Sequence, residues 1–329
     1  MPVKVQRYIA ILSVILFAAK MLAWWLTHSV TILTDALEGI VNMVAGFLGL
    51  YSVILSARPR DTNHPYGHGK VEFISAGVEG TLIVIAGCVI VLEAASHLMH
   101  PATLSHLNTG LVIVSAAGII NYLGGSWAMR QGKAHHSLVL ESAGAHLVTD
   151  AYSTLAVIIG VSVMLLTGNK WPWLDSVVAL FFAAITIRTG YLVLRRSVSG
   201  MMDEMDLNTL KAIIDLLQKN RPPQWVDLHN LRVIRYGSLM HIDAHLTLPY
   251  YQQVADADRE IHAMEDLIKT QFGDAVELFI HIDGCMPYQC HLCAMPDCKK
   301  RKSPLQSQIQ WNTTNVWEDV KHGRIAAGE

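Results

Sequence analysis

Six long apolar stretches lie within residues 1–202 of this chain, and they limit the folds that it can adopt. They occupy residues 8–27, 30–56, 73–99, 109–128, 139–167 and 173–194. As a helix, each stretch is long enough to cross a hydrocarbon core of about 30 Å. Only 16% of all residues are charged and 52% are hydrophobic, which is too apolar for an ordinary soluble protein. The sequence therefore predicts a membrane protein with six transmembrane helices.

Basic residues near the ends of these stretches predict how the helices are oriented. Nine of them lie at the N-terminus, in the second and fourth connections and at the end of the sixth stretch, whereas the other three connections hold only Lys170. The nine are Lys4, Arg7, Arg58, Arg60, Lys70, Arg130, Lys133, Arg195 and Arg196. Because short loops rich in Lys and Arg stay in the cytoplasm, we expect both termini to be cytoplasmic and the protein to lie in the cell inner (plasma) membrane.

The chain changes character near residue 202. Residues 200–284 contain 14 acidic and 7 basic residues and no run long enough to span a membrane. Their patterning predicts a helix at 206–220, strands at 228–236 and 239–248, a helix at 253–272 and a strand at 275–283. This αββαβ order is typical of a small α+β sheet with helices on one face. We therefore expect a transmembrane domain at 1–202, a soluble cytoplasmic domain at 203–284 and a tail at 285–329.

Two pairs of polar residues interrupt the apolar stretches. Glu38 and Asn42 are four positions apart in the second stretch, and His146 and Asp150 have the same spacing in the fifth, so each pair shares a helix face. An ionisable group at bilayer depth costs roughly 2.5–3.5 kcal/mol on insertion scales, and such groups usually face a polar interior or a pathway. Together the four side chains supply three oxygens and one nitrogen, which suits a divalent transition metal. Alternatively, each pair only hydrogen-bonds to neighbouring helices.

The connection between the second and third stretches predicts another metal site. The segment RPRDTNHPYGHGKVEF places Asp61, His64 and His68 within eight residues. Gly67 and Gly69 permit the tight turns that a cluster of three ligands requires. A polar loop with incidental histidines is the alternative.

Four of the five cysteines lie in the tail, with the spacing C-x₄-C-x₂-C-x₄-C. They are Cys285, Cys290, Cys293 and Cys298. Because the tail should be cytoplasmic and reduced, metal binding by thiolates is favoured over disulfides. A C-x₂-C turn with two further thiols can form a tetrahedral Zn–S₄ site. The spacing is not that of a standard zinc finger, so reduced thiols without a metal are the alternative.

In combination these segments resemble the cation diffusion facilitators, a family of proton-coupled exporters of divalent metals, and especially its bacterial zinc and iron exporters. The resemblance extends over residues 8–284 and is carried by AKMLAWWLTHSVTILTDALEGIVN, DTNHPYGHGKVE, HLVTDAYST, HNLR, HIDAHL and FIHIDGC. It implies a homodimer of six-helix units and a transport site between the second and fifth helices. It also implies a ferredoxin-like cytoplasmic domain that dimerises and senses metal.

The resemblance gives the polar membrane residues a role in transport. It implies a transport site formed by Glu38, Asn42, His146 and Asp150. Members of the family usually carry His or Asp where Glu38 stands and Asp where Asn42 stands, so these two positions depart from the pattern. The three loop residues match a second site of the bacterial zinc exporters.

The resemblance also implies a third site in the cytoplasmic domain. His245, His281 and Asp283 match its ligands, and His229 is a fourth. Asp258 takes the place of a bridging His when the alignment is shifted by one residue.

The sequence as a whole predicts a metal/proton antiporter that works by alternating access. It exports Zn²⁺ or Fe²⁺, with Mn²⁺ and Co²⁺ ranked behind them, and metal is also a regulatory ligand. The expected partners are protons, a second copy of the chain and membrane lipid, and there is no nucleic-acid signature. A membrane metalloenzyme that uses His146 and Asp150 as ligands is one alternative, although the chain contains no H-E-x-x-H. A metal sensor that is only anchored by its membrane part is the other.

Overall fold

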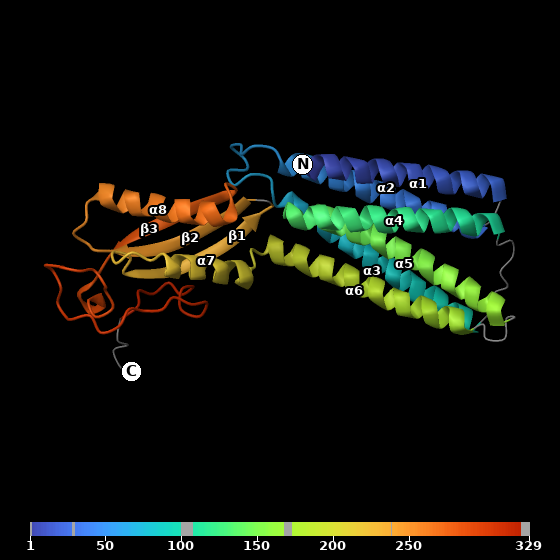
Figure 1. The fold of residues 1–329 in the computed structure, drawn as a ribbon. Coiled ribbons are helices and arrows are strands. Elements are labelled where there is room, and N and C mark those ends of the chain that lie inside the picture. The colour runs from blue at the N-terminus through green and yellow to red at the C-terminus, as the bar shows by residue number, and fades with distance from the viewer. Residues whose placement is uncertain (1, 28–29, 100–107, 168–172, 238, 324–329) are drawn as a thin grey trace. The chain divides into compact units, whose positions relative to one another are not determined.

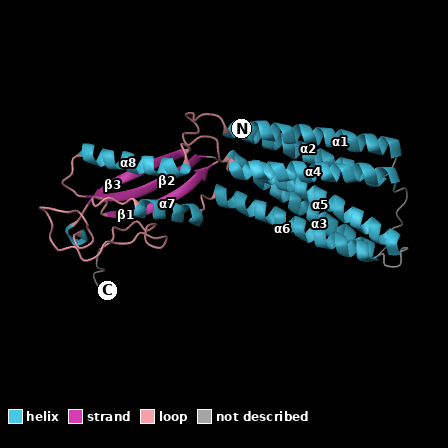
Figure 2. Ribbon diagram, viewed as in Figure 1, coloured by secondary structure: helices cyan, strands magenta, loops and turns pink. Residues whose placement is uncertain are grey.

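The computed structural model describes residues 2–27, 30–99, 108–167, 173–237 and 239–323, and Figure 1 shows its fold. The chain divides into two compact units, residues 1–202 and residues 203–329. Helices make up the first unit, and the strands lie in the second (Figure 2). Each unit is described separately below.

The first unit contains six long helices. They are α1 (Pro2–Thr27), α2 (Val30–Ser56), α3 (Val71–Met99), α4 (Asn108–Ala134), α5 (Leu138–Thr167) and α6 (Trp173–Met201). At 1.5 Å per residue each is about 40 Å long, enough to cross a hydrocarbon core. Within the described residues, Pro2–Leu22, Val71–Ser96 and Ser176–Met201 are long and apolar enough to do so by length and composition. The helices coincide with the six predicted stretches, and several of them extend a few residues further.

The helices pack in pairs, α1 along α2, α3 along α6 and α4 along α5. Helix α5 also contacts α2, α3 and α6, so it has more helical neighbours than a helix at the edge of a bundle. Large apolar side chains remain exposed on the outside of the unit, among them Leu92, Leu123 and Phe181. Such a surface would be unfavourable in water and is suited to lipid.

Two glycines allow α4 and α5 to touch. A Cβ atom on Gly144 would lie 2.6 Å from the carbonyl oxygen of Gly125, and a Cβ atom on Gly125 would lie 2.6 Å from that of Gly144. Any larger residue at either position would push the two backbones apart, as expected for small residues at helix interfaces in membranes. This contact fixes α5 two residues before His146.

The second unit has the predicted αββαβ order. Its elements are α7 (Leu207–Lys219), β1 (Asp227–Tyr236), β2 (Leu239–Leu248), α8 (Val254–Phe272), β3 (Val276–Gly284) and a short 3₁₀ helix (Pro287–Gln289). The sheet order is β1-β2-β3, with β1 and β2 antiparallel and β2 and β3 parallel. Helix α8 therefore provides the crossover that a parallel pair of strands requires.

One face of this sheet forms the core of the unit. In β2 the side chains of Ile242, Ala244, Leu246 and Leu248 are buried, as the period-two pattern predicts. Helix α7 contacts both β1 and α8, and α8 contacts β3, so the two helices cover the same face. The histidines of β2 point to the opposite face.

The tail packs on this unit. The backbone N–H of Asn230 donates to the carbonyl oxygen of Glu318, and that of Leu231 donates to Val316, both at 2.8 Å. These bonds form where the β1–β2 register is irregular between His229 and Arg232. Residues 315–322, here called the tail strap, therefore attach to β1.

Candidate metal sites

Three of the four polar membrane residues form one group. The Nδ2 atom of Asn42 on α2 donates a hydrogen bond of 2.5 Å to Oδ2 of Asp150 on α5. The Nε2 atom of His146 is 3.8 Å from Oδ1 of the same carboxylate. Glu38 lies on α2 one turn before Asn42, but its side chain is outside the part that the structure describes. The group thus links α2 to α5, and we call it, with Glu38, the membrane quartet.

Burial leaves the imidazole of His146 available as a ligand. His146 is 9% exposed, and its Nδ1 atom has no hydrogen-bond partner among the described residues. A buried nitrogen without a partner is unfavourable unless something binds it. The side-chain NH₂ group of Asn42 donates a hydrogen bond to Asp150. The side-chain carbonyl oxygen of Asn42 is the atom that can bind a cation.

The loop between α2 and α3 brings its three predicted residues together. The Oδ1 atom of Asp61 is 3.1 Å from Nδ1 of His64, and Oδ2 of Asp61 is 3.4 Å from Nε2 of His68. The three ligand atoms lie within 4.8 Å of one another, as in a site that can hold a metal ion. Gly67, with φ of +87°, makes the turn that returns the chain toward Asp61.

Backbone hydrogen bonds hold the Asp61 carboxylate in its charged form. It accepts from the N–H of His64 at 2.7 Å and from that of Asn63 at 3.0 Å. The bond from the backbone of His64 is the main reason why the pKa of Asp61 is below its usual value. An ionised carboxylate beside two imidazoles is a suitable donor set for Zn²⁺.

Strand pairing forms the cytoplasmic cluster, which we define as His229, His245, His281 and Asp283. The antiparallel register pairs His229 with His245, and the parallel register pairs His245 with His281, so three histidines stand side by side across the sheet. The Oδ2 atom of Asp283 is 3.3 Å from Nε2 of His229 and 3.3 Å from Nδ1 of His245. The Nε2 atom of His281 is 3.9 Å from the other carboxylate oxygen.

His229 and Asp283 are held in the protonation states that metal ligands need. Burial lowers the pKa of His229, which keeps its imidazole neutral and able to bind a metal. Burial alone would raise the pKa of Asp283, but its hydrogen bond and ion pair with Lys321 and the nearby His229 and His245 lower it overall. Asp258 is not part of this cluster: it lies on α8, exposed, with its carboxylate 3.6 Å from Nδ1 of His262.

The tail strap adds three residues that the sequence did not identify. Asp319 forms a second possible metal-binding group with His229 and His245. The Nζ atom of Lys321 is 2.8 Å from Oδ1 of Asp283. His322 donates through Nδ1 to the buried Asp227 at 2.6 Å, and this bond raises the pKa of His322. The strap has no periodicity and lies far from the cluster in sequence, so no local signal predicted these contacts.

Two buried carboxylates on α3 were also missed. Glu72 accepts hydrogen bonds of 2.6 Å from the hydroxyl groups of Ser56 and Ser137. Glu79, 1% exposed, lies close to Ser142 of α5. Both are acidic residues on a long apolar helix, where burial of an ionisable group is costly.

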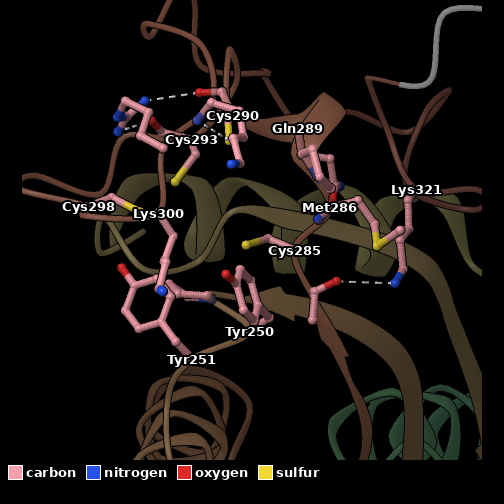
Figure 3. Close-up of a pocket in the computed structure, with 15 residues that line it drawn as sticks. Tyr250, Tyr251, Cys285, Met286, Gln289, Cys290, Cys293, Cys298, Lys300 and Lys321 are labelled. Atoms are coloured by element: carbon pink, nitrogen blue, oxygen red, sulfur yellow. Dashed lines mark hydrogen bonds between the residues drawn. The ribbon is translucent and has the colours of Figure 1, made fainter.

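The four tail cysteines line one pocket (Figure 3), together with Tyr250 and Tyr251. All four are free thiols, as is Cys88 on α3. Among the described residues, the sulfurs do not form a group whose ligand atoms all lie within 4.8 Å of one another, as those of the loop and the cytoplasmic cluster do.

Comparisons with known proteins cover both units. The family model of the cation efflux transmembrane domain matches residues 7–202, and that of the cation efflux protein cytoplasmic domain matches residues 205–285. An uncharacterized transporter of Synechocystis sp. is 31% identical over 273 residues, which are 82% of this chain and 87% of the relative. The cation-efflux pump FieF of Pectobacterium atrosepticum is 25% identical over 278 residues, 82% of this chain and 89% of the pump. The zinc transporter ZitB of Yersinia pestis is 22% identical over 294 residues, which are 87% of this chain and 88% of the transporter.

Proposed function

The chain belongs to the cation efflux family, the cation diffusion facilitators, and from this premise we propose that it exports Zn²⁺ or Fe²⁺ from the cytoplasm in exchange for protons. Membership confirms the predicted family, the helical membrane domain followed by a cytoplasmic domain, and the transport of divalent metal cations. The protein is therefore a transporter, and the alternatives of a metalloenzyme and of an anchored sensor are wrong.

The membrane quartet is the transport site in this proposal. The observation that carries it is the contact of Asn42 with Asp150, because it joins α2 to α5 through side chains that can bind a cation. Movement of α2 against α5 would open such a site to one side of the membrane and then to the other. The metal is released on the side where protons compete with it best.

Zn²⁺ and Fe²⁺ are the proposed cargo for two reasons. The relative from Yersinia pestis is named a zinc transporter. The quartet combines imidazole nitrogen with carboxylate and amide oxygens, and such mixed donors bind Zn²⁺ and also Fe²⁺, with Mn²⁺ and Co²⁺ ranked behind. Metal uptake by sealed vesicles that contain the protein, measured for these four ions, tests this ranking.

Basic residues and exposed apolar side chains support the proposed orientation of the chain in a lipid membrane. The basic residues at the helix ends support cytoplasmic termini in the inner (plasma) membrane of the cell, with the second unit in the cytoplasm. The exposed apolar side chains of the helices would contact lipid. A second copy of the chain is the proposed partner, since residues 205–285 match a cytoplasmic domain that dimerises in this family.

We expect Asn42→Asp to tighten Zn²⁺ binding at the quartet. The substitution replaces an N–H donor to Asp150 with a second carboxylate, so two like charges face each other until a cation binds between them. We expect the affinity for Zn²⁺ to rise about tenfold, which corresponds to about 1.4 kcal/mol of binding free energy. The measurement is the Zn²⁺ concentration for half-maximal transport. Asn42→Ala is the matched variant and should weaken binding, because it removes the carbonyl ligand. Equal affinities in all three proteins would contradict this role of Asn42.

The cytoplasmic cluster is the proposed regulatory site. Residues 200–284 carry 14 acidic and 7 basic residues, so two such domains side by side repel each other. Bound cations would reduce this repulsion and draw two protomers together. Lys321 supplies a positive charge to Asp283 from within the chain. A metal that binds Asp283 must therefore compete with this ammonium group.

Lys321→Met is accordingly expected to tighten Zn²⁺ binding at the cytoplasmic cluster. The two side chains are 25% and 16% exposed, and loss of this ion pair should tighten binding by about fivefold, or about 1 kcal/mol. The measurement is a Zn²⁺ titration of chelator-treated full-length protein, restricted to the binding that His281→Ala abolishes. Lys219→Met, which removes the same charge from α7 beneath the other face of the sheet, is the control. If both lysine variants bind like the parent, Lys321 does not compete with the metal.

A further inference from the structure

A pocket of about 570 Å³ lies where β3 ends and the tail begins (Figure 3). Cys285 directly follows β3, and the other three pocket cysteines come from the first loops of the tail. The backbone N–H of Cys285 donates to the carbonyl oxygen of Leu248 at 2.8 Å, so this residue is fixed to the end of β2. Cys293 is 8% exposed. One of the four cysteines is therefore fixed at the end of the sheet, and the other three belong to the tail.

Hydrogen bonds hold the C-x₂-C turn in shape. The guanidinium group of Arg301 donates to the carbonyl oxygens of Cys290 at 3.0 Å, Cys293 at 3.1 Å and Met295 at 2.7 Å. The backbone N–H of Lys302 donates to the sulfur of Cys290 at 3.4 Å. Hydrogen bonds of this kind around a metal ligand fix its orientation.

Cations surround the thiols. The pocket is lined by Lys300, Arg301, Lys302 and Lys321. Cysteine binds metal in its thiolate form. A divalent metal held by four thiolates has a net charge of about −2. These side chains supply the opposite charge.

We propose that this pocket is a Zn²⁺ site formed by the thiolates of Cys285, Cys290, Cys293 and Cys298. Soft thiolate ligands select Zn²⁺ over Mn²⁺ and Fe²⁺, and a structural zinc site takes four ligands in a tetrahedron. Because Cys285 follows β3 directly and the other three cysteines belong to the tail, a shared metal would tie the tail to the end of β3. The site lies in the tail beyond the matched cytoplasmic domain, except for Cys285, and it is separate from the membrane quartet.

Cobalt titration tests this site in the full-length protein. Reduced, chelator-treated protein should develop thiolate-to-cobalt charge-transfer absorption that saturates at one equivalent of Co²⁺ per chain. The double variant Cys290→Ser and Cys293→Ser should lose this absorption. Cys88→Ser, which removes the cysteine of α3, is the matched control and should keep it. His245→Ala should also keep it, because that residue belongs to the cytoplasmic cluster and not to the pocket.

Alkylation of the unmodified sequence gives a test that does not depend on the folding of a variant. Stoichiometric Zn²⁺ should protect all four pocket cysteines from a thiol reagent, at least about tenfold in rate, and leave Cys88 unprotected. Reduced protein without charge-transfer absorption, or pocket cysteines that react equally fast with and without Zn²⁺, would overturn the proposal. Metal transport is measured in parallel, and its loss or retention concerns the quartet alone.

Discussion

Replacing Asp150 with alanine is expected to abolish metal transport while the protein stays folded. The carboxylate contacts both Asn42 on α2 and His146 on α5, so it is the shared member of the quartet. Loss of a residue that only supports a metal ligand commonly costs about 10–100-fold in affinity or activity. Loss of a direct anionic ligand should cost at least as much. The measurement is the initial rate of Zn²⁺ uptake into vesicles.

Two comparisons make this result specific to the site. Glu93→Ala removes a carboxylate from an exposed position on α3 and should leave the rate unchanged. Circular dichroism and size-exclusion chromatography of Asp150→Ala should match the parent, since an alanine is well tolerated within a helix. Vesicles of Asp150→Ala that move metal at the parental rate would show that the quartet is not the transport site.

Competition between proton and metal should make transport affinity depend on pH. A neutral imidazole binds metal and a protonated one cannot, and the ordinary pKa of His is about 6.5. The apparent affinity for Zn²⁺ should therefore fall as the pH on the cytoplasmic side drops from about 7.5 to about 6, the range in which imidazole groups titrate. His146→Gln should show a flatter profile together with weaker transport.

The sequence predicts the helices and strands better than it predicts the tertiary contacts between them. Apolar runs gave the six helices because a membrane span must be long and uniformly apolar, and the alternation in β2 separated Ile242 from His245. The alignment of His229, His245 and His281 depends on one antiparallel and one parallel register. No local pattern specifies both registers, so only the family resemblance pointed to this group.

The tail strap is the clearest example of what the sequence could not provide. His322 contacts Asp227 across 95 positions, and Lys321 reaches Asp283 from a segment without periodicity. These contacts arise because the strap attaches to the irregular part of β1, a tertiary event with no signature in either segment alone. The cysteines of the tail were recognisable from spacing, yet their common pocket depends on how the tail folds back on β3.

Proton movement driven by metal is the most direct test of antiport through the quartet. The purified protein is reconstituted into liposomes that contain a pH indicator and a metal indicator, and Zn²⁺ or Fe²⁺ is added outside at equal pH on the two sides. We predict that metal entry is accompanied by alkalinisation of the lumen, that an acidic lumen accelerates entry, and that Asp150→Ala eliminates both signals. Metal entry at the parental rate with no change in luminal pH and no response to a pH gradient would contradict the account.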